Sequence, residues 1–201
     1  MKLGLILECG PGGPDEQVYR FLARALIPKV ELRCETMVNK RKLVSECGKV
    51  AARLLKDGCE RVGIVWDLFP GWGTPEEEHC LGQDRDDIFA SLKEAGVGKP
   101  DVQLVCVQQE LEAWLLADSR ALTSFFSRPT HPAKKIPEFK SPEHVSNPKG
   151  QLRKLFATYL GKNRRYNEMV DALRLFRNVP DWERMKRCPS FVRFLERILG
   201  Q

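Results

Sequence analysis

The sequence predicts an α/β protein with a mainly parallel four-stranded sheet flanked by helices, followed by an α-helical C-terminal extension. Four short apolar runs recur within the first 107 residues, and segments of helical period separate them. Beyond residue 107 the pattern changes, and from residue 149 onward only helical patterns remain. Strands that alternate with helices form βαβ units, which place the strands parallel and cover both faces of the sheet.

The individual elements follow from the spacing of apolar residues. Runs without helical period predict strands at 3–7, 30–36, 61–66 and 102–107. Apolar residues that recur on one face predict helices between them, at 17–27, 42–56 and 84–95. Further helices are expected at 109–118, around 152–159, and near 166–176 and 190–199.

The chain divides into three expected parts. Residues 1–125 form the α/β core, and residues 149–201 form a basic helical extension that packs on it. Between them, residues 126–148 are rich in Pro, Lys and Ser and show no apolar period, which predicts a flexible loop.

Composition places the chain among ordinary globular proteins, with 42% hydrophobic and 30% charged residues. No apolar run approaches the roughly 18 residues of a membrane span, and the start lacks the pattern of a signal peptide. We therefore expect a cytoplasmic protein without a membrane partner. Seven cysteines without a CxxC pair, and three histidines without ligand spacing, argue against a disulfide framework and a zinc site. Most of the cysteines are expected to be reduced and buried.

Charge is distributed unevenly along the chain. Residues 1–118 carry a net charge of −5, whereas residues 119–201 carry +11. An acidic part followed by a basic part is typical of a metal-binding core beside a surface that binds a polyanion. A basic, solvated face without a partner is the alternative explanation.

Acidic residues stand at the ends of three predicted strands. Glu8, Asp67 and Glu110 each follow an apolar run. In a parallel sheet the carboxyl ends of the strands gather at one edge, where ligands bind. Three carboxylates there repel one another unless a cation binds, and oxygen ligands of this kind suit Mg²⁺ or Mn²⁺. The alternative for each one is an ordinary helix cap or loop acid.

Two further features of the sequence each allow two interpretations. The glycine-rich stretch at 9–15 predicts either a loop whose backbone approaches an anion or a tight turn capped by Asp15. The acidic run Asp84, Asp86 and Asp87 predicts either an extra metal ligand or, more simply, the solvated start of a helix.

The segment at 109–118 is the most specific in the sequence. If it is one helix, Glu110, Trp114 and Asp118 share a side, while Glu112 points elsewhere. Acids in a short helix that directly follows a buried strand are hard to explain by packing alone.

These residues resemble those of a known group of proteins. A glutamate after the first strand, an aspartate ending the third, and the later run ELEAWLLAD are similar to the Toprim fold. More closely, the chain resembles a Toprim-like family of unknown function (domain of unknown function 4276), related to the OLD-type Toprim nucleases. The pieces Asn147-Pro148-Lys149, Tyr166 and Cys188-Pro189-Ser190-Phe191 are similar to the end of that family.

The resemblance implies hydrolysis of phosphodiester bonds in DNA or RNA with Mg²⁺ or Mn²⁺, in a prokaryotic defence or repair system with a partner ATPase. It implies that Glu8, Asp67, Glu110 and Glu112 bind metal, and that Lys149 stabilises charge on the phosphate during catalysis. Glu8, Asp67, Glu110 and Lys149 are thus the candidate catalytic residues. The basic extension would hold the nucleic acid backbone.

One position departs from the Toprim pattern. Where Toprim proteins usually carry Asp-x-Asp, this chain reads Asp67-Leu68-Phe69, so the second acid is missing. The alternative function is therefore a non-catalytic Toprim-like subunit that binds a nucleic acid or an ATPase. A third possibility, nucleotidyl transfer, uses the same metal chemistry.

Overall fold

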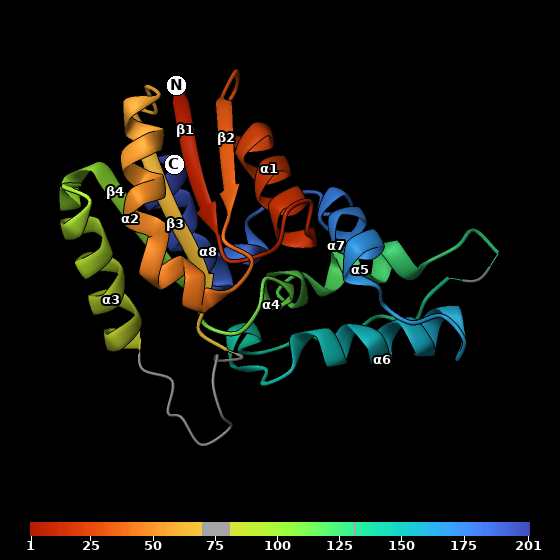
Figure 1. Ribbon diagram of the computed structural model, residues 1–201. Helices are drawn as coiled ribbons and strands as arrows, with labels where there is room; N and C mark the ends of the chain where they lie inside the picture. Colours follow the sequence, from red (N-terminus) through yellow and green to blue (C-terminus); the bar gives the residue numbers. More distant parts are fainter. Residues whose placement is uncertain (70–80, 131) are drawn as a thin grey trace. The chain divides into compact units, whose positions relative to one another are not determined.

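The computed structural model describes residues 1–69, 81–130 and 132–201 (Figure 1). The chain folds as two compact units. The first, here called the sheet unit, comprises Met1–Val107 and the returning segment Arg193–Gln201. The second, the helical unit, comprises Gln108–Val192. The expected division at residues 125 and 148, including a flexible loop, stays a prediction, because compactness does not measure mobility.

The sheet unit is built on four strands that all run parallel, which confirms the predicted fold class. Their order across the sheet is β2-β1-β3-β4, so the first strand lies inside the sheet beside the third. The two central strands are buried along almost their whole length, as expected for a parallel sheet covered on both faces. The strands are β1 (Lys2–Leu7), β2 (Glu31–Thr36), β3 (Arg61–Asp67) and β4 (Val102–Val107).

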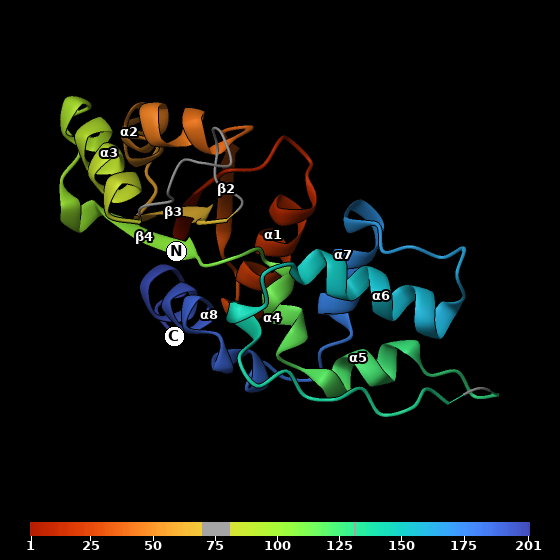
Figure 2. The same ribbon diagram turned by 90° about the horizontal axis from the view of Figure 1, so that it is seen from below.

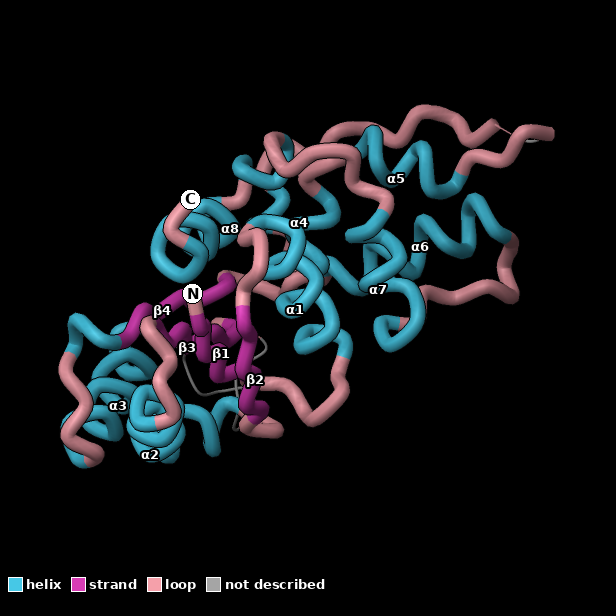
Figure 3. Tube along the Cα trace, turned by 90° about the horizontal axis from the view of Figure 1, so that it is seen from above, coloured by secondary structure: helices cyan, strands magenta, loops and turns pink. Residues whose placement is uncertain are grey.

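Helices cover both faces of this sheet. Figures 2 and 3 show α2 and α3 on one face, with α1 and the C-terminal segment on the other. The helices of the sheet unit are α1 (Pro14–Leu26), α2 (Lys40–Lys56), α3 (Leu81–Glu94), the 3-10 turn η1 (Lys99–Asp101) and the π-helix η4 (Phe194–Leu199). The helices α1, α2, α3 and η4 lie close to the ranges that the apolar spacing predicts, whereas the turn η1 was not predicted.

Two glycines allow these layers to approach each other closely. At Gly48 of α2, an added Cβ would lie 2.0 Å from the backbone oxygen of Ser91 in α3. At Gly63 of β3, an added Cβ would lie 2.7 Å from the side chain of Ile198 in η4. A larger residue at Gly48 therefore requires a backbone shift, and one at Gly63 requires the Ile198 side chain to move.

The returning C-terminal segment is an integral part of the sheet unit. The rings of Phe194 and Tyr19 lie 5.2 Å apart, so η4 packs against α1. The guanidinium group of Arg61 donates to the backbone oxygen of Ile198 at 3.2 Å and so holds the end of η4 on β3.

The helical unit packs around α4, whose five residues are all buried. Its core is aromatic: Phe156 contacts Phe126 with centroids 5.1 Å apart, and Trp114 contacts Phe191 at 5.0 Å. The elements of the unit are α4 (Glu112–Leu116), α5 (Ser119–Phe126), η2 (Pro142–His144), α6 (Pro148–Leu160), α7 (Glu168–Arg177), η3 (Arg184–Arg187) and α8 (Pro189–Arg193), whose last residue opens the returning segment.

The single helix expected at 109–118 is wrong in its extent. The α-helix α4 ends at Leu116, and Asp118 caps the next helix by accepting from the backbone N–H groups of Arg120 and Ala121. Because Glu110 precedes α4 and Asp118 follows it, Glu110, Trp114 and Asp118 do not share the side of one helix. The acid at position 118 has a local structural role.

The cysteines within the described residues carry free thiols. Three of them, Cys47, Cys59 and Cys188, are buried, and the others are half-buried. Burial raises the pKa of Cys9 and Cys34 to about 12, so these thiols stay protonated at neutral pH. Their behaviour as small apolar groups agrees with expectation. His144 is exposed; Cys80, His79 and His131 lie outside the described residues.

Candidate functional site

The candidate site begins at the carboxyl edge of the sheet, between β1 and β3. The chain leaves β1 toward β2 on one side, and it leaves β3 toward β4 on the other. Such a reversal is a topological switch point, the place where open parallel sheets bind ligands. Glu8 directly follows β1, and Asp67 is the last residue of β3. We call Glu8 and Asp67 the strand-end pair.

The two residues of the strand-end pair are in direct contact. The backbone N–H of Asp67 donates to Oε2 of Glu8 at 3.1 Å. Burial of the Glu8 carboxyl raises its pKa from 4.5 to about 7, because a buried carboxylate loses its hydration. The Asp67 N–H and the charge of Lys40 oppose this rise, whereas Asp15 and Asp84 add to it. Glu8 is therefore a carboxyl group that exchanges a proton near neutral pH.

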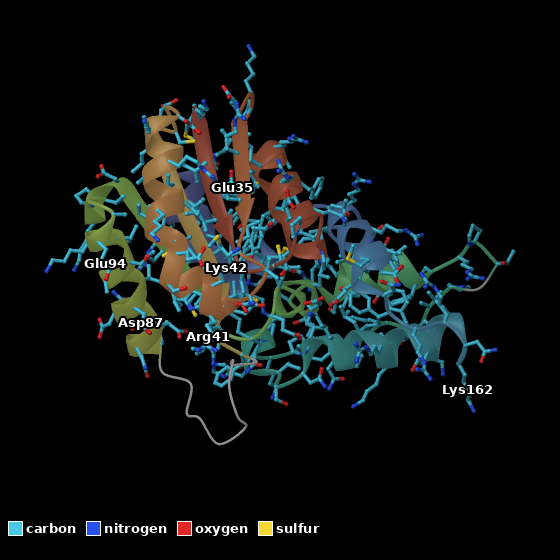
Figure 4. The ribbon with its side chains drawn as sticks, viewed as in Figure 1. Glu35, Arg41, Lys42, Asp87, Glu94 and Lys162 are labelled. Atoms are coloured by element: carbon cyan, nitrogen blue, oxygen red, sulfur yellow. The ribbon has the colours of Figure 1, made fainter. Side chains whose placement is uncertain are left out.

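A buried lysine lies beside this pair. The ammonium group of Lys40, only 2% exposed, donates to the backbone oxygen of Leu68 at 2.8 Å and lies 3.8 Å from Oδ2 of Asp84. The same Asp84 oxygen accepts from Nε1 of Trp66 at 3.1 Å. Asp84 thus faces the strand ends, whereas Asp86 and Asp87 are exposed on α3, as Figure 4 shows for Asp87.

The three acids of the run at 84–87 therefore lie in two different surroundings. The explanation as a solvated helix start holds for Asp86 and Asp87 but is wrong for Asp84, which is largely buried and contacts Lys40 and Trp66 through Oδ2. Sequence reasoning missed Lys40, although a signal was present. The basic run 40–42 opens α2, where the helix dipole disfavours cations. A cation at that position needs anionic neighbours, and Lys40 has them.

The glycine-rich loop after β1 forms hydrogen bonds with side chains of α1, the helix that follows it. The backbone N–H of Gly12 donates to Oε2 of Glu16 at 2.8 Å, and the Gln17 amide donates to the Gly12 oxygen at 2.9 Å. Gly13 is the N-cap of α1 and the helix has no side-chain cap, so the expected capping role of Asp15 is wrong. Because Glu16 already accepts from the loop, the turn explanation is the better of the two.

The helical unit holds a second cluster of charged groups. Nζ of Lys149 lies 3.1 Å from Oε1 of Glu110 and 2.8 Å from Oε2 of Glu168. The buried Glu112 accepts from the hydroxyl of Tyr166 at 2.9 Å. The sequence motifs indicated four of these residues; Glu168, in the first turn of α7, was missed because an acid there is an ordinary helix start.

Lys149 is held in its charged form. Burial lowers the pKa of Lys149, but Glu112, Glu168 and Glu110 outweigh that effect, so the pKa rises above its usual value. The residue is therefore a permanent positive charge among three carboxylates. In this arrangement it offers no base for proton transfer.

The segment at 109–118, the most specific in the sequence, has in part a packing role. Nε1 of Trp114 donates to Oγ of Ser190 at 2.7 Å, and the Ser190 hydroxyl in turn donates to the buried Glu143. Glu143 also accepts from the Ser190 backbone N–H at 3.1 Å, at the start of α8. The motif at 110–118 and the motif at 188–191 are thus connected through a buried polar network.

The predicted catalytic and metal-binding residues fall into the two units. Glu8 and Asp67 belong to the sheet unit, whereas Glu110, Glu112 and Lys149 belong to the helical unit. Convergence of Glu110 on the strand-end pair stays a prediction. Within the described residues, no group of three or more His, Cys, Asp or Glu side chains is placed to hold a metal ion together.

Comparisons with known proteins give a family. Neither the curated proteins nor the solved structures contain a significant match to the chain. No helix in the described part of the chain is long and apolar enough to cross a bilayer. A family model does match, from residue 16 to residue 199. Since that match covers most of the length of the chain, the chain belongs to the family described as a domain of unknown function (DUF4276).

Proposed function

We propose that this protein hydrolyses phosphodiester bonds in nucleic acid with Mg²⁺ or Mn²⁺. The observation that carries the proposal is the strand-end pair: Glu8 and Asp67 are in contact at a topological switch point, and burial raises the pKa of Glu8 to about 7. A carboxyl group in that state, beside other acids, gains strongly from a nearby cation.

The donor set fits a divalent cation in kind. Mg²⁺ is usually bound by one or two carboxylates, with water and substrate phosphates completing its shell. Glu8 and Asp67 would supply those carboxylates. A bound Mg²⁺ or Mn²⁺ would supply Lewis-acid stabilisation of the phosphate and a more acidic bound water.

The remaining residues of the sheet-unit cluster have supporting roles in this proposal. Lys40 and Trp66 fix the orientation of Asp84, through contacts of 3.8 Å and 3.1 Å to the same oxygen. Lys40 keeps a positive charge beside the acids and limits their mutual repulsion.

For the helical unit, the proposal follows the family resemblance. Glu110 and Glu112 would add metal ligands, and Lys149 would stabilise charge on the phosphate. The positive charge of Lys149 supports this role, although Glu110 and Glu168 hold its ammonium group in the ligand-free protein. The excess of basic residues at 119–201 supports an electrostatic hold on the nucleic acid backbone.

The test is cleavage by the purified full chain of plasmid DNA, single-stranded DNA and RNA, with Mg²⁺, Mn²⁺ or EDTA. Glu8→Gln and Asp67→Asn should each abolish metal-dependent cleavage. Glu94→Gln and Asp87→Asn are matched controls, because they remove the same groups from exposed positions of α3 (Figure 4). Controls and native chain should cleave equally; cleavage that persists in both site variants would refute the proposal.

A non-catalytic subunit is the second candidate. The observation that favours it is Lys40, whose ammonium group already neutralises Asp84 beside the strand ends, together with Phe69 where a second acid is expected. In that case the chain would bind a nucleic acid or a partner ATPase without turnover. Absence of cleavage and of Mn²⁺ binding, with stable co-purification of an ATPase, would support this candidate.

A further inference from the structure

A cavity of about 360 Å³ lies on the opposite side of β3 from β1, along the free edge of β4. One wall comes from α3, with Arg85 and Phe89, and another from the C-terminal segment, with Arg193 and Arg197. Lys99 of η1 closes one end. Four of the lining residues are therefore cations, and none of the lining residues in the described part of the chain is acidic.

Three of these cations, Arg85, Lys99 and Arg197, are exposed, and Arg193 is half-buried. None of Arg85, Lys99, Arg193 and Arg197 forms an ion pair with a described residue. Two of them lie over the ring of Phe89 instead: Nζ of Lys99 is 4.3 Å from its centroid and the Arg85 guanidinium is 6.0 Å away. An aromatic face attracts cations weakly, so it offsets little of their mutual repulsion. An anion in the cavity would offset it.

The arginines from the C-terminal segment are held in place by the sheet. Arg193 donates to the backbone oxygen of Cys106 at 3.3 Å, and Arg197 donates to that of Leu104 at 3.2 Å. A guanidinium group has five N–H donors, so one bond to a carbonyl leaves others for a ligand. The same bonds occupy the carbonyls of the β4 edge, which disfavours the addition of a further strand from a peptide.

We propose that this cavity binds a small phosphorylated molecule of about the size of a diphosphate or a nucleoside diphosphate. Fixed guanidinium groups recognise phosphate oxygens through paired hydrogen bonds, and the volume falls in the range of small-ligand sites. Binding here does not depend on the proposed hydrolysis. Trp66 lines the cavity and its Nε1 donates to Asp84, so the cavity adjoins the acidic cluster.

The test is calorimetric titration of the full chain with pyrophosphate and with ADP, without metal and at about 0.15 M salt, which screens loose surface attraction. The double variant Arg85→Gln/Lys99→Gln removes two exposed cavity cations. Its matched control, Lys56→Gln/Lys93→Gln, removes two exposed cations of the same unit that lie outside the cavity.

The native chain and the control should bind pyrophosphate equally, and the cavity variant should bind at least about tenfold more weakly, as expected from lost charge-assisted hydrogen bonds. Tighter binding of ADP than of pyrophosphate would identify a nucleotide, and equal binding would identify the phosphates alone. The proposal is overturned if the control loses as much affinity as the cavity variant. It is also overturned if a single-stranded oligonucleotide binds while pyrophosphate and ADP do not.

Discussion

Replacement of Glu8 by glutamine should stabilise the protein at alkaline pH and leave it unchanged at acidic pH. The carboxyl group has a pKa of 4.5 in an ordinary setting and about 7 in the fold. Below pH 4.5 it is neutral in both the folded and the unfolded chain. As the pH rises from 4.5 through 7, the unfolded chain releases the proton more readily than the folded chain does, so the free energy of unfolding falls. One unit of pKa corresponds to about 1.4 kcal/mol, so the loss approaches roughly 3 kcal/mol.

Urea denaturation at pH 4 and pH 8 measures this difference. Glu8→Gln should match the native free energy of unfolding at pH 4 and exceed it by up to about 3 kcal/mol at pH 8, since glutamine still accepts from the Asp67 N–H. The exposed control Glu94→Gln should show no such pH dependence. An equal effect of Glu8→Gln at both pH values, or a loss of stability at pH 8, would refute the reasoning. At pH 8, Mg²⁺ should raise the free energy of unfolding of the native chain more than it raises that of the Glu8→Gln variant.

Three further variants test the packing and the buried charges, each by urea denaturation. Gly48→Ala should cost about 2 kcal/mol, because its Cβ would lie 2.0 Å from the oxygen of Ser91; an unchanged midpoint would show that α2 and α3 can separate freely. Ser190→Ala should cost about 2 kcal/mol through loss of the acceptor for Trp114, and native stability in this variant would contradict the buried network. Lys40→Met should cost about 3 kcal/mol at pH 8, because it removes the buried cation of an acidic cluster; equal stability would mean that the cluster needs no cation.

The sheet and its helices could be predicted from the sequence because their signals are local. Apolar runs such as those at 61–66 and 102–107 are too short and too uniform for helices, and the intervening segments carry a clear helical period. A strand-end acid such as Asp67 is likewise visible, because it follows directly on a buried run. The contact between Asp67 and Glu8 then follows from strand order, which the pattern does not contain.

The parts that could not be predicted depend on tertiary partners. The period at 109–118 continues through a real break, because Asp118 caps a new helix and no spacing rule distinguishes a cap from a helical acid. Burial of Asp84 depends on Trp66 and Lys40, which are far from it in sequence. The spacing places Trp114 on one side with Glu110 and Asp118, whereas its indole donates to Ser190, 76 residues later.

The most direct test of the proposed site is a titration of the full chain with Mn²⁺, in which electron paramagnetic resonance measures the concentration of the free ion. The proposal predicts that the native chain binds Mn²⁺ and that Glu8→Gln and Asp67→Asn each weaken this binding at least about tenfold, since each removes one of the two carboxylates. The controls Glu94→Gln and Asp87→Asn should bind as the native chain does. Equal Mn²⁺ affinity in the native chain and both site variants, or no binding by the native chain, would contradict a metal site at the ends of β1 and β3.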